Sequence, residues 1–221
     1  MFTDRVDAGR RLAMRLQHFA HDPDAVVVGL PRGGVPVARE VATLLGLRLD
    51  VIVVRKLGVP SQPELAMGAI GEDGVQVVSE EIVRRAGVRV GDFDAVVARE
   101  RQQVEARARR YRLGRPPVNL KDRVVIVVDD GIATGSTARA ACDVARTTGA
   151  RWVVVAVPVA PMGWQDRLGL AADEFVAVET PGDFRAVGNF YADFSQTTDD
   201  EVIQCLRSVD AQHAASEPRP T

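Results

Sequence analysis

Short apolar runs alternate along the chain with longer segments in which apolar side chains recur every three to four positions. The runs are rich in valine and lack polar alternation, which predicts strands buried on both faces. These predicted strands are 25–30, 49–54, 123–128, 152–157 and 174–178. The segments with helical spacing are 4–20, 36–45, 80–86, 92–113, 137–148 and 199–209.

This alternation predicts an α/β fold with a doubly wound, mostly parallel central sheet and flanking helices. Residues 57–74 are rich in glycine, proline and polar side chains, and we expect a long loop there, with a β-ribbon between 67–71 and 75–78. A single domain is expected over residues 1–210. The small, polar, proline-containing tail 211–221 is expected to be disordered.

Composition limits the classes of function. The 221 residues are 46% hydrophobic and carry a formal charge of −2, which gives no electrostatic signature for nucleic-acid binding. No apolar run approaches the roughly 20 residues that span a bilayer. The charged, amphipathic segment 1–16 does not resemble a secretory signal. Cys142 and Cys205 are far apart, which favours two reduced thiols in a cytoplasmic protein.

The most informative segment runs from Asp129 to Thr137. The strand 123–128 carries Asp129 and Asp130 to its end, small and hydroxyl residues follow, and a helix begins directly afterwards. The free N–H groups at a helix start form an anion site, and Gly135 lets the backbone approach a phosphate closely. Carboxylates repel phosphate but suit a ribose diol or hydrated Mg²⁺. The combination describes a ribose 5-phosphate site.

A purely structural turn and other nucleotide-binding motifs are the alternative interpretations. An Asp-Asp turn followed by a threonine N-cap explains the pair alone, but the full nine-residue string favours a functional site. The segment is not a Walker motif, because no lysine follows Gly135. Residues 29–34 likewise lack the glycine spacing of a dinucleotide-binding turn.

A second loop, Pro31-Arg32-Gly33-Gly34, follows the first predicted strand. Its two glycines expose backbone N–H groups, and Arg32 can bind an anion through two N–H groups. A tight turn with a surface arginine is the alternative. Beside the acidic pair, we favour the functional interpretation.

The run Val124–Thr137 resembles the ribose-phosphate motif of type I phosphoribosyltransferases, and the resemblance extends over roughly residues 25–193. It implies a 5-phosphoribosyl-1-pyrophosphate (PRPP) substrate, Mg²⁺ and a purine or pyrimidine base as acceptor. Asp129 and Asp130 would hold the ribose hydroxyls, directly or through the metal. The 5-phosphate would be wrapped by Ala133, Thr134, Gly135, Ser136 and Thr137.

The resemblance also implies which residues would bind the leaving pyrophosphate. The loop with Pro31, Arg32, Gly33 and Gly34 would bind pyrophosphate, together with Arg55 and Lys56, which open a mobile lid over residues 57–74. The N- and C-terminal segments would form a small hood. The implied catalytic residues are Asp129, Asp130, Lys56 and Arg32. For Arg55 and Lys56, two solvated charges are the alternative.

The acceptor base stays open. Phe184 and Val187 lie in a segment that resembles the base-stacking segment of 6-oxopurine enzymes, although a small satellite core explains these apolar residues equally well. Ala133 stands where 6-oxopurine enzymes have an aspartate, which speaks against hypoxanthine or guanine.

The predicted activity is therefore Mg²⁺-dependent transfer of a phosphoribosyl group from PRPP to a base, with release of pyrophosphate. The alternative of another class is a PRPP- or nucleotide-sensing regulator without turnover, and a hydrolase or phosphorylase is a third option. A homodimer is one option for the assembly. The arginine-rich stretch 99–115 is interpreted as a solvated helix face with ion pairs four residues apart, because no aromatic residues interleave as a stacking platform.

Overall fold

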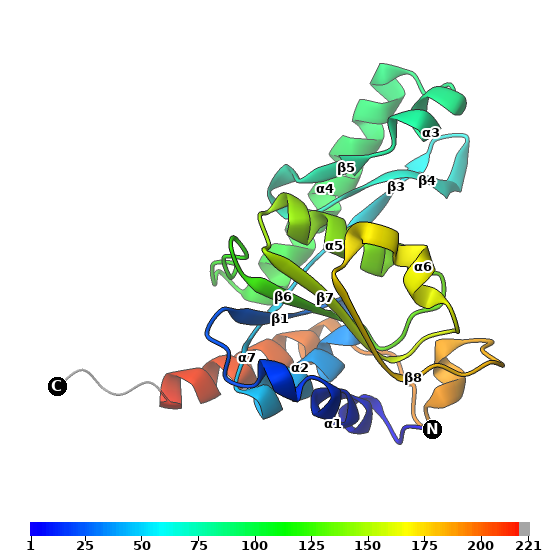
Figure 1. Cartoon of the computed structure of the whole chain (residues 1–221). Helices are drawn as coiled ribbons and strands as arrows, with labels where there is room; N and C mark the ends of the chain where they lie inside the picture. The colour runs from blue at the N-terminus through cyan, green and yellow to red at the C-terminus, as the bar shows by residue number, and fades with distance from the viewer. Residues whose placement is uncertain (217–221) are drawn as a thin grey trace.

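Five parallel strands form the central sheet, in the order β2-β1-β6-β7-β8 (Figure 1). The computed structural model describes residues 1–216, apart from the side chains of residues 73, 215 and 216. The strands are β1 Ala25–Gly29, β2 Arg48–Val51, β6 Val124–Val128, β7 Trp152–Val159 and β8 Glu174–Glu179. All five predicted strands are present. Every residue of β1 and β6 is buried, which explains their lack of polar alternation.

Helices cover both faces of this sheet. One face packs against α1 Arg5–Arg15, α2 Gly34–Leu45 and α7 Asp199–Ser216, and the other against α5 Ser136–Thr147 and α6 Trp164–Leu168 (Figure 1). Short 3₁₀ turns complete these layers at η1 Gln17–Phe19, η3 Gly169–Ala171 and η4 Val187–Phe190. Successive residues of a strand enter opposite layers, as Val27 and Val26 do. The predicted doubly wound α/β fold is confirmed.

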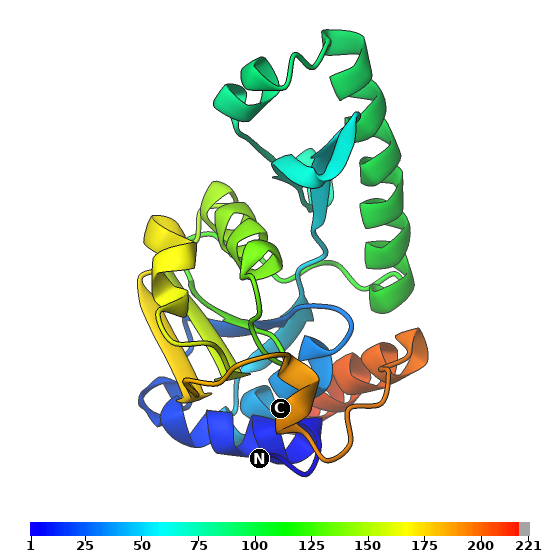
Figure 2. The ribbon, with the colours of Figure 1, turned by 90° about the vertical axis from the view of Figure 1, so that its right-hand side faces the viewer.

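Residues 55–112 form a module that projects from the central sheet (Figures 1 and 2). Its antiparallel sheet consists of β3 Arg55–Val59, β4 Gln62–Ile70 and β5 Gln76–Val78. The turn η2 Glu72–Gly74 and the helices α3 Glu80–Arg85 and α4 Val90–Arg112 complete it. We call residues 55–112 the projecting module.

The predicted loop over residues 57–74 is wrong, whereas the predicted ribbon is part of a larger sheet. The glycines that suggested a loop serve close approaches between strands instead. A Cβ on Gly58 would lie 2.5 Å from the Pro63 carbonyl oxygen, and one on Gly68 would lie 3.2 Å from the Val78 Cα. Glycine inside a strand often marks such an approach.

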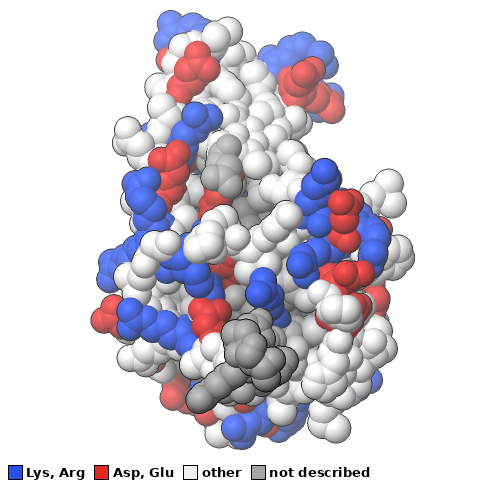
Figure 3. All heavy atoms as spheres, turned by 90° about the vertical axis from the view of Figure 1, so that its left-hand side faces the viewer, with Lys and Arg blue, Asp and Glu red and all other residues white. Residues whose placement is uncertain are grey.

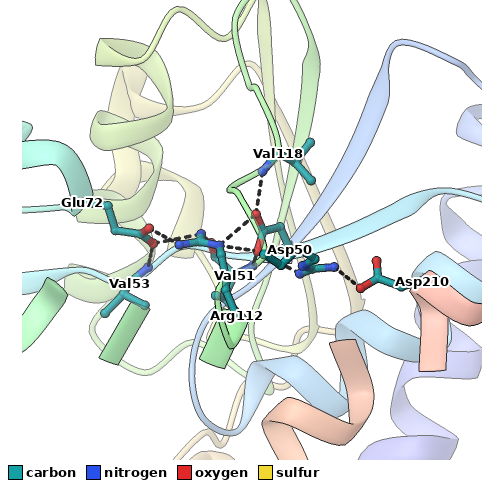
Figure 4. Close-up of polar contacts among 8 residues, drawn as sticks. Asp50, Val51, Val53, Glu72, Arg112, Val118 and Asp210 are labelled. Atoms are coloured by element: carbon teal, nitrogen blue, oxygen red, sulfur yellow. Dashed lines mark hydrogen bonds and ion pairs between the residues drawn. The ribbon is translucent and has the colours of Figure 1, made fainter. Parts of the chain in front are cut away.

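A buried ionic cluster ties the projecting module to the central sheet (Figure 4). The Arg112 side chain, 7% exposed, donates from Nε to Asp50 Oδ1 at 2.9 Å and from Nη2 to the Val51 carbonyl at 2.9 Å, and it also pairs with Glu72. Glu72 in turn accepts the Val53 N–H at 3.2 Å. The chain segments that enter and leave the module therefore meet at one guanidinium.

The last helix departs from the sequence prediction. Residues 211–216 continue α7, whereas their composition predicted disorder; residues 217–221 of that prediction lie outside the described residues. Within residues 1–216, no helix has both the length and the apolarity needed to cross a membrane.

Charged side chains of both signs are interspersed on the face shown in Figure 3. The arginines of α4 follow the same pattern, because Arg109 pairs with Glu105 at 3.6 Å and Arg110 with Asp199 at 2.9 Å. The stretch 99–115 thus contains an ion pair four residues apart, as predicted, between Glu105 and Arg109.

Candidate functional site

Two loops converge at the carboxyl edge of the central sheet. Asp129 and Asp130 directly follow β6, and the loop after the neighbouring strand β1 carries Arg32, Gly33 and Gly34. A Cβ on Gly34 would lie 2.6 Å from the Val128 carbonyl oxygen, and one on Gly33 would lie 2.7 Å from Asp130 Cγ. Gly34 thus leaves room for the Val128 carbonyl, and Gly33 leaves room for the Asp130 carboxylate. The structure thus brings together the two loops singled out from the sequence, at the edge where such sheets bind ligands.

The acidic pair lies in a desolvated setting. Burial raises the pKa of Asp129 well above its usual value, and the neighbouring charge of Asp130 raises it further. Burial also raises the pKa of Asp130, while Arg5 opposes that rise. The Asp130 N–H donates to Asp129 Oδ1 at 2.9 Å, and the Tyr191 hydroxyl donates to the Asp130 carbonyl at 2.6 Å. The pair is held rigidly from the backbone.

Arg5 is a residue of this site that sequence reasoning missed. Asp4 caps α1 by accepting the Asp7 N–H, which places Arg5 at the first helical position. Its Nε donates to Asp130 Oδ2 at 2.9 Å, and its Nη1 donates to the Ser195 carbonyl at 2.7 Å. The Nη2 atom also lies 2.8 Å from Asp130 Oδ2 in the ion pair. The guanidinium also lies over the Phe194 ring, 4.1 Å from its centre. An arginine in a first helical turn carries no local sequence signal for such a role.

The predicted phosphate loop leads into α5. Gly135 adopts the left-handed conformation, with φ 79°, and no side chain caps the helix. Thr134 and Thr137 are exposed, and the hydroxyls of Thr134 and Ser136 lie 3.1 Å apart. The Ala133 carbonyl accepts from Arg167 at 2.7 Å. An uncapped helix start with hydroxyls around it is a ready anion site.

Arg55 and Lys56 are not brought to the acidic pair. Arg55 Nε donates to Glu100 Oε2 on α4 at 2.9 Å. Lys56 is exposed and lines a separate hollow of about 430 Å³ that includes Glu64 and Arg99. Their assignment to pyrophosphate stays a prediction that requires movement of the projecting module.

The C-terminal segment packs beside the acidic pair. Phe184 stacks on Phe190, with ring centres 5.6 Å apart, and both pack against a small cluster that contains Phe2 and Tyr191. Val187 lies against Gly131, since a Cβ there would be 2.5 Å from Val187 Cγ1. The satellite core is present, so Phe184 needs no ligand to explain it. Base binding by Phe184 and Val187 stays a prediction.

The acidic pair suits Mg²⁺ that arrives with a substrate. Among residues 1–216, no group of three or more His, Cys, Asp or Glu side chains is arranged to hold a metal ion. In that part of the chain, Arg5 donates a hydrogen bond to one oxygen of Asp130, and the Asp130 N–H donates to one oxygen of Asp129. Each carboxylate keeps its second oxygen. One or two carboxylates that share Mg²⁺ with substrate phosphates are typical of magnesium sites.

A parallel α/β sheet that ends in an acidic pair and an uncapped helix start is the arrangement expected of a domain that binds a sugar phosphate. The model of the phosphoribosyl transferase domain family matches residues 4–168. The chain belongs to this family, so the predicted family is confirmed.

Two relatives are similar to this chain in sequence. A Mycobacterium tuberculosis H37Rv protein, provisionally assigned as a phosphoribosyl transferase, is 53% identical over 206 residues, which are 93% of this chain and 46% of that protein. The chain thus spans about half the length of that relative. The adenine phosphoribosyltransferase of Kineococcus radiotolerans is 33% identical over 156 residues, 65% of this chain and 82% of that enzyme.

The crystal structure of TT1426 from Thermus thermophilus has a similar fold, with a TM-score of 0.85 at 45% identity. The match covers 94% of this chain and 98% of that one. It therefore extends well beyond the residues that the family model matches.

Proposed function

We propose that this domain transfers a 5-phosphoribosyl group from PRPP to a purine or pyrimidine base, releases pyrophosphate and depends on Mg²⁺. The observation that carries the proposal is the juxtaposition of Asp129 and Asp130 with the uncapped start of α5. Membership of the phosphoribosyl transferase domain family supports it.

Each part of the substrate has a matching group in the chain. The start of α5 offers N–H groups and hydroxyls to the 5-phosphate, and the free oxygens of Asp129 and Asp130 accept from the ribose hydroxyls. Arg32 and the amides of the glycine loop hold the pyrophosphate as negative charge develops on it. Asp129 and Asp130 would hold Mg²⁺, which could also link them to the ribose hydroxyls, and the bound ion would supply positive charge to the pyrophosphate.

Water must be kept from the ribosyl centre, because it competes with the base for the developing cation. The projecting module carries Lys56 and is the part of the chain suited to close over the site. On the other side, the segment around Val187 borders Gly131, and we assign base binding to this segment. Neither feature selects one base, so the acceptor class stays purine or pyrimidine.

Calorimetric titration of the protein with PRPP, with and without Mg²⁺, tests substrate binding. Release of pyrophosphate is then followed with a panel of purine and pyrimidine bases. We expect Mg²⁺-dependent binding and release with at least one base. Binding of PRPP without release by any base would instead indicate the sensing regulator, and would refute the transferase.

Substitution of the acidic pair tests the mechanism. Asp130→Asn should lower turnover at least about 100-fold, because placement of the reacting groups is lost, while the far-ultraviolet circular dichroism stays unchanged. Asp94→Asn, at an exposed position of α4, is the matched control and should retain full turnover. Normal turnover by Asp130→Asn would exclude the proposed role of this carboxylate.

A further inference from the structure

A hollow of about 330 Å³ opens beside the acidic pair, between the start of α1 and the segment that leads into α7. Its polar lining comes from Arg5, Arg32, Gly33, Asp130, Gln196 and Thr197. Two guanidiniums face this hollow, and the single carboxylate that lines it, Asp130, is already paired with one of them. The lining therefore favours an anion.

Arg5 is fixed in the wall of this hollow. Two of the five N–H groups of its guanidinium donate to Asp130 and to the Ser195 carbonyl, and Nη2 lies 2.8 Å from the same Asp130 oxygen. The side chain is 12% exposed, and Phe194 supports one face of its plane. An arginine held in this way loses little further rotational freedom when its remaining N–H groups bind a ligand.

The charge of the leaving group calls for more than one cation. Of the three basic side chains assigned to pyrophosphate from the sequence, only Arg32 lies at the acidic pair, because Arg55 pairs with Glu100 and Lys56 lines another hollow. Arg5 is the second guanidinium that the structure places there.

We propose that Arg5 is a substrate-binding residue, which binds the pyrophosphate group of PRPP together with Arg32 across this hollow while it positions Asp130. The inference rests on the proposed function and adds a residue of the N-terminal helix to the site. Planar guanidinium groups are well suited to phosphate oxygens, which accept two parallel N–H bonds.

The helix α1 supplies a matched control. Arg11 also pairs with an aspartate, Asp7 at 2.9 Å, and also lies over an aromatic ring, that of Phe2 at 5.2 Å. The Arg11 side chain is 44% exposed and does not line the hollow. Arg5→Met and Arg11→Met thus remove the same kinds of contact from one helix, but only Arg5→Met removes a charge from the hollow.

The test is calorimetric binding of two probes, inorganic pyrophosphate with Mg²⁺ and ribose 5-phosphate, to the full chain and its variants. We expect Arg5→Met to weaken pyrophosphate binding about tenfold or more and ribose 5-phosphate binding less than about threefold. Arg11→Met should change neither. Arg5→Lys, which keeps the charge but loses the planar fork, should fall between the parent and Arg5→Met, and it decides the matter if Arg5→Met does not fold.

Three outcomes would overturn the inference. The first is a parent protein that does not bind pyrophosphate, or folded Arg5 variants that bind it as tightly as the parent. The second is an equal loss for Arg11→Met, which would trace the effect to α1 as a whole. The third is an equal loss of both probes in Arg5→Met, which would mean that Arg5 acts only through Asp130. No base is present in this test, so failure of turnover, seen as absent pyrophosphate release from PRPP, is a separate result.

Discussion

Gly33 offers a precise perturbation of the site, because a single methyl group added there meets the acidic pair. The backbone of Gly33 has φ −62° and ψ −32°, which alanine adopts without strain. The added Cβ would overlap Asp130 Oδ2 and lie 2.7 Å from Asp130 Cγ and 3.3 Å from Arg5 Nε. Ordinary carbon contacts are about 3.5–4.0 Å. The Asp130 carboxylate must therefore move by roughly 1 Å.

The expected cost in stability is small, and the expected cost in function is large. Overpacking destabilises by about 1–3 kcal/mol, and the loss of glycine freedom in the unfolded chain offsets about 0.4–1 kcal/mol of this. The net loss lowers Tm by a few degrees for a chain of this length. A displacement of about 1 Å in a catalytic group costs on the order of 100-fold in rate.

The assay pairs thermal unfolding with pyrophosphate release from PRPP by Gly33→Ala. Gly91→Ala in α4 is the control, because its added Cβ meets no atom within 4 Å. That variant should gain about 0.5–1 kcal/mol in helix stability and keep its turnover. If Gly33→Ala folds and turns over PRPP like the parent, Asp130 does not need its present position and the site is wrongly assigned.

Two further predictions concern the ionic cluster and the acidic pair. Arg112→Met leaves Asp50 buried without its main partner, at a cost of about 3–5 kcal/mol, so thermal unfolding should show a Tm lowered by roughly 10 °C. Arg109 is mostly exposed, and Arg109→Met should shift the Tm by less than about 2 °C. Equal shifts of the two variants would contradict the stabilising role of the ionic cluster. The raised pKa of Asp129 makes the folded state bind the proton more tightly, so its contribution to stability is complete below the unfolded value of 3.8 and is lost as pH rises through the folded value. Denaturant unfolding of the parent should therefore lose stability relative to Asp129→Asn between acidic and neutral pH, and parallel pH profiles would contradict this assignment.

The central sheet could be predicted because its strands are buried on both faces. Valine runs such as Val124–Val128 have one environment along their whole length, so composition alone identifies them. Asp129 and the glycine loop directly follow two of these strands. They are therefore site candidates, because ligands bind at the carboxyl edge of such sheets. The end of α2 was also predicted correctly, because Gly46 follows it in the left-handed conformation, with φ 66°.

The projecting module could not be predicted in the same way. Its strands β3 and β4 are partly exposed, contain glycine and proline, and shift register at Leu57 and Gly58. Neither period 2 nor a continuous apolar run survives such irregularity. The pairing of Arg5 with Asp130 joins residues 125 positions apart, and no local pattern encodes it. Both features depend on tertiary contacts.

The ion pair of Arg5 with Asp130 raises the question of whether this proposed catalytic carboxylate is a structural residue instead. The chain contains its own comparison in Asp50, which is 3% exposed and accepts from Arg112, Arg115 and the N–H groups of Val51 and Val118. That carboxylate is saturated, and a ligand has no oxygen to reach (Figure 4).

Asp130 differs from Asp50 in its exposure and in the number of its donors. Its side chain is 15% exposed, and the described residues engage one of its oxygens through a single guanidinium. It faces a glycine that leaves room for it, and it is followed within six residues by an uncapped helix start. A purely structural ion pair requires none of these features, whereas a carboxylate that must accept a ribose hydroxyl requires an oxygen and space beside it. The geometry around Asp130 therefore favours binding of a ligand over internal pairing alone.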